Sequence, residues 1–193
     1  MARTKEFDPE AALQAAMELF WQRGYEATSM ADLVERLGVG RASLYATFGS
    51  KHDLYLKALD RYAELTDPQL LAELSQPGPA LPAVRAVLRR YALNSLGEQR
   101  ERGCFVVNTA AELASHDAES ARRVLASWDH LETLLASALT RAQAQGELGP
   151  QKDPRALARL LLALLQGVRL IGKACGDDGR VRDAIAQAES LLD

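Results

Sequence analysis

Apolar residues recur at the spacing of an α-helix along nearly the whole chain, and this regularity constrains the fold more than any other feature. The first such stretch opens at Asp8 and Pro9, which suit an N-cap and a first helical position. Its apolar face would carry Leu13, Ala16, Met17 and Phe20. We find no convincing strand-like run. The sequence therefore predicts an all-α fold.

Three short helices are expected in the first fifty residues, the second and third joined by a glycine turn. Thr28 or Ser29 would cap the second helix, with Asp32 in capping-box spacing to Ser29. Gly38-Val39-Gly40 follows, and a third helix runs to about Phe48. This order is a helix-turn-helix pattern, in which the third helix enters the major groove of DNA.

Beyond this motif the chain has length for a second, larger unit. It has 193 residues, of which 48% are hydrophobic and 25% charged, the balance of a globular protein. The clearest linker is Ser75-Gln76-Pro77-Gly78-Pro79. We expect a helix-turn-helix DNA-binding domain over residues 1–50, a connecting helix over 51–74, and a larger helical domain over 75–193.

The charge does not by itself indicate a nucleic-acid-binding protein. The chain has 23 Lys+Arg against 26 Asp+Glu, and residues 1–62 hold 8 against 9. A protein that held DNA by bulk charge would be basic there. A DNA-binding function must therefore depend on the motif. The alternative is a helical protein-interaction module that keeps the fold without binding an operator.

Two stretches, GYEATSMADL (residues 24–33) and LGVGRASLYATFGSK (residues 37–51), resemble the DNA-binding domain of the TetR/AcrR family of transcriptional repressors. Gly40 and Ala42 depart from the family pattern, which more often has a serine and a glycine at these places. The resemblance implies an N-terminal helix-turn-helix domain and a C-terminal ligand-binding and dimerisation bundle. It implies a homodimeric repressor that a small molecule or cysteine modification releases from a palindromic operator.

The resemblance also places the DNA contacts. Thr28 and Ser29 would meet a phosphate at the start of the second helix, and Tyr45 and Lys51 would contact the backbone. Arg41 is the sharpest candidate for a base contact, to guanine. The full expected set is Thr28, Ser29, Arg41, Ala42, Ser43, Tyr45, Thr47 and Lys51. As alternatives, Tyr45 could pack against the first helix and Arg41 could be a solvated surface residue.

Residues 157–171 are apolar around more than one face, so this helix needs a partner beyond its own core. Small residues there would let a second helix come close. The resemblance implies that this helix and the last one form a four-helix interface between two copies. The expected interface residues are Leu160, Ala163, Leu164, Gly167, Ile185 and Ala188. The alternative is a central helix buried within one monomer.

Cys104 stands where a helix should begin, close to Arg100 and Arg102. A helix N-terminus and nearby arginines both favour the reactive thiolate. The surrounding segment is similar to a TetR branch that includes electrophile- and oxidant-responsive repressors. The alternative is a small buried hydrophobe. The candidate ligand or sensor residues are Tyr91, Cys104, Phe105, Asn108, Glu112 and Trp128.

Other function classes find little support. There is no phosphate-binding glycine loop and no metal-ligand spacing among His52, His116 and His130, so neither a cofactor nor a metal is expected. A Cys104 nucleophile with His116 as its base would lack a third group, so no enzyme is expected. The two cysteines, 71 positions apart, form no disulfide framework. The stretch Leu160–Leu165 is too short to span a membrane, and no secretory signal is apparent, so we expect a cytoplasmic protein. Its expected partners are an operator in double-stranded DNA, a second copy of the chain and an unknown small-molecule effector.

Overall fold

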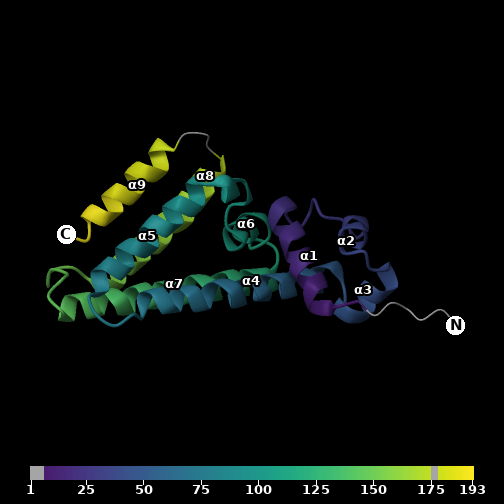
Figure 1. The fold of residues 1–193 in the computed structure, drawn as a ribbon, viewed down its shortest axis with the longest axis horizontal. Helices are drawn as coiled ribbons and strands as arrows, with labels where there is room; N and C mark the ends of the chain where they lie inside the picture. The colour runs from purple at the N-terminus through teal and green to yellow at the C-terminus, as the bar shows by residue number, and fades with distance from the viewer. Residues whose placement is uncertain (1–6, 175–177) are drawn as a thin grey trace.

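The computed structural model describes residues 7–174 and 178–193, which form helices joined by short loops (Figure 1). The all-α prediction is confirmed. Cys175, which the sequence suggests is structural or merely exposed, lies outside the described residues. None of the described helices is long and apolar enough to cross a membrane.

The helices follow one another with few residues between them. The N-terminal part contains α1 (Pro9–Arg23), α2 (Met30–Leu37), α3 (Arg41–Phe48) and the start of the long α4 (Lys51–Leu74). The remainder contains α5 (Ala80–Leu96), the 3-10 helix η1 (Glu98–Arg102), α6 (Phe105–Glu112), α7 (Ala118–Ala144), α8 (Pro154–Ala174) and α9 (Gly179–Ser190).

Side-chain caps fix where the first helices begin. Asp8 caps α1, and Pro9 occupies its first turn. Ser29 caps α2 and Ser50 caps α4, each in a complete capping box with the aspartate three residues later. These caps agree with the sequence pattern. Of the two residues expected to cap the second helix, Ser29 rather than Thr28 does so.

Two hydrophobic cores hold the molecule together. One lies among α4, α5, α7, α8 and α9. The other joins α1–α4 to α6 and to the start of α7, so Phe105 and Val124 pack with the N-terminal helices. The ring of Tyr55 in α4 lies 5.0 Å from that of Phe20 and 5.4 Å from that of Phe105. The helix-turn-helix part therefore shares a core with the bundle.

Figure 1 shows an elongated molecule with α2 and α3 at one end. Helices α4 and α7 run along one edge of the molecule. Helices α5 and α8 run obliquely away from that edge, and α9 lies beside them. Helix α6 lies at the junction with α1. Leu65 of α4 is 47% exposed, because that turn of α4 borders a cavity rather than the core.

Candidate functional site

Helix α3 presents one face to the core and the other to solvent. Leu44 and Phe48 are buried against the neighbouring helices. The opposite side exposes Arg41, Ala42, Tyr45 and Thr47, while Ser43 is half-buried. The residues expected at DNA on this helix therefore share an accessible surface, with small side chains between the larger ones.

Arg41 and Tyr45 lie together on this surface. The Arg41 guanidinium stands 5.7 Å from the centre of the Tyr45 ring, and one of its N–H groups donates to the Tyr45 hydroxyl over 3.4 Å. Tyr45 is 42% exposed, which excludes the alternative that it packs away against α1. The Lys51 ammonium lies 4.1 Å from the centre of the Tyr25 ring. In the described part of the chain neither cation has a carboxylate partner, so both are available to phosphates.

Thr28 and Ser29 are placed differently from one another. Thr28 is fully buried, and its hydroxyl donates to the carbonyl of Gly24 over 2.7 Å. This corrects the expectation that its hydroxyl meets a phosphate, because a buried side chain cannot reach one. Ser29 stays exposed at the start of α2, where its Oγ accepts the Asp32 N–H over 3.1 Å.

Glu112, expected at a ligand pocket, instead ties α6 to the helix-turn-helix part. Its carboxylate accepts the backbone N–H of Tyr25 over 3.0 Å and that of Glu26 over 2.8 Å. Both donors lie in the loop between α1 and α2. Gly24 in that loop has φ of +87°, and a Cβ there would lie 2.9 Å from the Glu112 carboxylate. The backbone conformation therefore favours glycine, and a Cβ there would displace the Glu112 carboxylate.

A cavity of about 310 Å³ lies where α1 meets the bundle. Side chains of α1, α4, α5, α7 and α8 line it, together with the segment that leads into α6. Three of the expected residues, Tyr91, Cys104 and Trp128, do line this cavity.

Besides Glu112, two more of the expected pocket residues lie outside this cavity. Phe105 is fully buried in the core shared with α1–α4. Asn108 donates to the Arg102 carbonyl over 2.8 Å and accepts from Lys173 over 3.1 Å, away from the cavity. The helical turn of α6 rotates both side chains, like that of Glu112, off the cavity wall. Helical spacing alone could not reveal this rotation.

Cys104 is half-buried at the N-cap of α6, as the sequence predicts. The Tyr62 hydroxyl donates to its sulfur over 3.8 Å. Burial, and then the neighbouring Cys104, raises the pKa of Tyr62 well above its usual value, so this hydroxyl keeps its proton.

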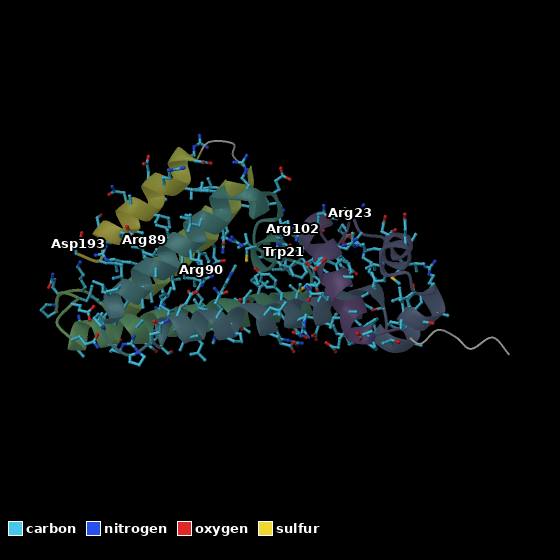
Figure 2. The ribbon with its side chains drawn as sticks, viewed as in Figure 1. Trp21, Arg23, Arg89, Arg90, Arg102 and Asp193 are labelled. Carbon is cyan, nitrogen blue, oxygen red and sulfur yellow. The ribbon has the colours of Figure 1, made fainter. Side chains whose placement is uncertain are left out.

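The backbone carbonyl of Gly103, the residue before Cys104, accepts hydrogen bonds from two different helices. The Gly103 oxygen accepts from the Trp21 indole of α1 over 3.3 Å and from the Arg169 guanidinium of α8 over 3.0 Å. Figure 2 shows Trp21 and Arg102 side by side there, with the Arg102 guanidinium 5.8 Å from the Trp21 ring. Helices α1 and α8 therefore both contact the residue that precedes Cys104.

The sequence pattern missed Trp21, Tyr62 and Arg169 as cavity residues. Trp21 and Tyr62 look like ordinary apolar positions of their helices. Arg169 did carry a signal, because a charged residue interrupts the apolar run of α8 on the same face as Leu161 and Leu165. A lone arginine on a buried helix face requires a polar partner.

The two faces of α8 differ. Leu161, Leu165 and Val168 lie in the monomer core, and a second face exposes Leu160 and Ala163, with Leu164 and Gly167 half-exposed. Helix α8 is thus not buried on all sides within one monomer. A Cβ at Gly167 would meet no atom of the described chain within 4 Å. Ile185 and Ala188, expected at the dimer interface, are instead buried in the bundle core, because α9 turns its apolar stripe toward α5.

The alternative of a Cys104–His116 catalytic pair finds no support in the geometry. His116 is exposed, and its Nδ1 lies 3.2 Å from the Ser115 hydroxyl, while the polar group at the Cys104 sulfur is Tyr62. Among residues 7–174 and 178–193, no group of histidine, cysteine and acidic side chains is arranged to hold a metal.

Comparison with known proteins identifies relatives over the whole chain. The HTH-type transcriptional regulator YezE of Bacillus subtilis (strain 168) is 37% identical over 195 residues and covers 100% of both chains. The HTH-type transcriptional repressor ComR of Escherichia coli (strain K12) is 36% identical and covers 87% of this chain and 80% of its own. Among solved structures, a cysteine mutant of the TetR family transcriptional regulator CifR, complexed with 26-bp operator DNA, has a TM-score of 0.84 at 29% identity and covers 100% of both chains.

Two family models cover most of the sequence. The family described as "Bacterial regulatory proteins, tetR family" matches residues 12–58, which hold most of α1, all of α2 and α3, and the start of α4. The family described as "Tetracyclin repressor-like, C-terminal domain" matches residues 80–188. These relatives are regulators rather than enzymes. With a helix-turn-helix end, a helical bundle and relatives along its full length, the chain belongs to the TetR family of bacterial transcriptional regulators.

Proposed function

We propose that this protein is a homodimeric repressor that holds a palindromic operator through α3 and is released by a change at the Cys104 cavity. The observation that carries the DNA contact is the exposed face of α3, where Arg41 and Tyr45 stand beside the small residues Ala42 and Ser43. Small side chains let the helix approach base edges closely, and an arginine reads guanine. As a DNA-binding regulator it would act in the cytoplasm.

In this proposal, residues of α3 and residues on either side of it contact the sugar-phosphate backbone of DNA. Tyr45 and Lys51 would bind phosphates, with Thr47 near the groove edge. Ser29 at the exposed start of α2 would contribute through the helix N-terminus. Thr28 would support these contacts from inside, by holding the loop that precedes α2. The DNA-binding domain would comprise residues 1–50, with α4 (51–74) connecting it to a ligand and dimer domain over 75–193.

The dimer in this proposal forms through α8. Leu160, Ala163, Leu164 and Gly167 follow one face of α8 at helical spacing, and the other described helices leave Leu160 and Ala163 exposed and Leu164 and Gly167 only partly buried. Burying this face against the same face of a second copy would be favourable and would obey two-fold symmetry. The two α3 helices would then enter successive major grooves about 34–36 Å apart.

The signal in this proposal travels through α6. Cys104 caps one end of this eight-residue helix, and Glu112 at its other end holds the loop before α2. A group added to Cys104, or a ligand bound beside it, would shift α6 and with it that loop. The effector would act by favouring a dimer shape in which the two α3 helices no longer match the operator. ComR, a repressor, and CifR, crystallised on operator DNA as a cysteine mutant, are consistent with this arrangement.

The direct test is to select binding sites from genomic fragments around the gene and map the protected bases. We expect two half-sites one helical turn apart. The variant Tyr45→Phe with Lys51→Ala should lose specific binding, while light scattering still gives the mass of two 21.0 kDa chains. Specific binding by this double variant equal to that of the parent would overturn the site assignment. Failure to select any DNA would favour the interaction-module alternative.

A further inference from the structure

Two buried donor groups, on residues that line the cavity, have no hydrogen-bond partner in the described part of the chain. They are the indole Nε1–H of Trp128 and the Nε–H of Arg169, both buried. Arg169 is only 9% exposed, and another N–H of its guanidinium donates to the Gly103 carbonyl. A buried donor without a partner is costly, so these two N–H groups favour an acceptor that enters the cavity.

The charge of Arg169 also lacks a partner among the described residues. Its guanidinium lies 6.0 Å from the centre of the Tyr91 ring, and it forms no ion pair there. By contrast Arg90, which lines the same cavity, donates to Glu73 over 2.9 Å. Glu18 at the cavity lies 3.6 Å from Arg36. Asp67 lines the cavity too, but makes no ion pair with Arg169. A buried guanidinium without a paired anion favours a ligand that brings one.

The tyrosines at the cavity do not supply that anion. Burial, assisted by Cys104, raises the pKa of Tyr91 to about 12, and burial raises that of Tyr62 well above its usual value. Both hydroxyls therefore remain neutral near pH 7. A Cys104 thiolate could balance part of the Arg169 charge, but an electrophile consumes the thiolate when it forms a bond to sulfur.

We infer that the cavity receives a small electrophile that carries its own carboxylate, whose oxygens accept from Arg169 and Trp128 while its reactive carbon reaches Cys104. This inference rests on the proposed role of Cys104 as the sensor. The cavity volume of about 310 Å³ is at the small end of ligand pockets and suits a short unsaturated acid.

The covalent step is a conjugate addition. The Cys104 thiolate attacks one carbon of a double bond that is conjugated to a carbonyl group. A C–S bond forms, the π electron pair moves toward that carbonyl, and the adjacent carbon then takes a proton from water. The thiol proton leaves to solvent beforehand, no group is expelled, and no oxidant or reductant is needed.

The test compares monomethyl fumarate, which carries one carboxylate, with neutral dimethyl fumarate. Peptide mapping of the full-length protein would give the rate at which each reagent modifies Cys104 at pH 7. Each rate is divided by the rate of the same reagent with 2-mercaptoethanol, which removes the difference in intrinsic reactivity. We expect a normalised preference of about tenfold for the monoanion, from charge-assisted hydrogen bonds. Equal normalised rates, or no modification of Cys104 by either ester, would overturn the inference.

Variants identify the groups responsible. Arg169→Gln should abolish the preference, and Trp128→Phe, which keeps an aromatic ring but removes the N–H, should reduce it. Arg90→Gln is the matched control, since Arg90 lines the same cavity but is paired with Glu73, and the preference should persist in it. A preference unchanged in both Arg169→Gln and Trp128→Phe would contradict the assignment. If Arg169→Gln does not fold, Trp128→Phe and the parent still decide.

These rates do not involve DNA. If monomethyl fumarate modifies Cys104 with the expected preference but leaves operator binding intact, the proposed sensor function fails while the ligand class stands. If the preference is missing but neutral electrophiles still release the operator through Cys104, the ligand class fails and the function stands.

Discussion

Glu112 shows how a single side chain joins the two parts of this molecule. Its carboxylate receives two backbone N–H groups from the loop before α2, although it belongs to α6. Glu147 does the same for the start of α5, where it accepts from Ala80 over 3.1 Å and Leu81 over 2.9 Å. The two carboxylates therefore make equivalent bonds in different places, and only one of them touches the helix-turn-helix part.

We expect Glu112→Ala to lower the free energy of unfolding by about 1–3 kcal/mol and to weaken operator binding, because the loop before α2 loses its anchor. Glu147→Ala should cost a similar amount of stability without changing operator affinity at a temperature where both variants are folded. Urea unfolding and fluorescence anisotropy on operator DNA measure the two effects. Equal operator affinity for Glu112→Ala and the parent would show that α6 does not position this loop.

Individual residues also show which positions could be predicted from the sequence and which could not. Capping residues identified the starts of α1, α2 and α4 because their chemistry is local. Asn108 and Glu112 were misplaced because their partners, Lys173 and the Tyr25–Glu26 loop, are brought near only by the tertiary fold. Thr28 was misplaced because its hydroxyl bonds locally to Gly24 and is buried. Cys104 was placed correctly at a helix start, but its contact with Tyr62 spans 42 positions and has no local signal.

At the scale of whole helices, periodicity predicts which residues share a face but not which neighbour covers that face. Ile185 and Ala188 lie on one stripe of α9, as expected, yet that stripe packs into the monomer core. Helix α8 has two apolar stripes, as the sequence predicts, and the second of them is partly exposed in the monomer. The inner stripe also contains a charged residue, Arg169. Its position at the cavity could not be predicted from the sequence.

Helix α8 gives a prediction about assembly with a closely matched control. Leu160 on α8 is 48% exposed and Leu71 on α4 is 47% exposed. We expect Leu160→Glu to weaken the dimer by about tenfold or more, because a carboxylate would be buried against its symmetry mate. Leu71→Glu should leave the dimer unchanged. Sedimentation over a range of concentrations measures both, and dissociation by the two variants to the same extent would refute an α8 interface.

The start of α7 gives a prediction about pH. Burial alone would raise the pKa of Asp117, but hydrogen bonds from His52 and Ser120 outweigh it and hold that pKa at about 2. The carboxylate thus stabilises the folded state above about pH 4, its ordinary pKa in an unfolded chain, and this stabilisation disappears as the pH falls toward 2.

Asp117→Asn keeps a cap for α7 but removes the charge. We expect it to be less stable than the parent by about 1 kcal/mol at pH 7 and to approach the parent's stability between pH 3 and 2. Urea unfolding at a series of pH values, followed by circular dichroism, checks this. A difference that stays constant from pH 7 to pH 2 would mean that the charge of Asp117 contributes nothing.

On the scale of the whole molecule, the cavity lies between the two functions that the protein has to connect. Helix α1 of the helix-turn-helix part lines it together with α4, α5, α7 and α8 of the bundle. The shared core of α1–α4 with α6 makes relative movement of these parts a coupled event rather than a free hinge. The fold class and the family could be predicted from the sequence, because the motif around α3 is local. The cavity could not, because its walls come from separate elements along the chain.

In the proposed mechanism, modification of Cys104 controls the binding of α3 to DNA. The most direct test of this mechanism is fluorescence anisotropy on the selected operator, with the parent and Cys104→Ser each titrated before and after treatment with a thiol-reactive electrophile, in the presence of excess competitor DNA. We predict tight binding by both untreated proteins, loss of binding by the treated parent, and retention of binding by treated Cys104→Ser. Loss of operator binding by treated Cys104→Ser to the same extent as by the treated parent would show that Cys104 is not the sensor.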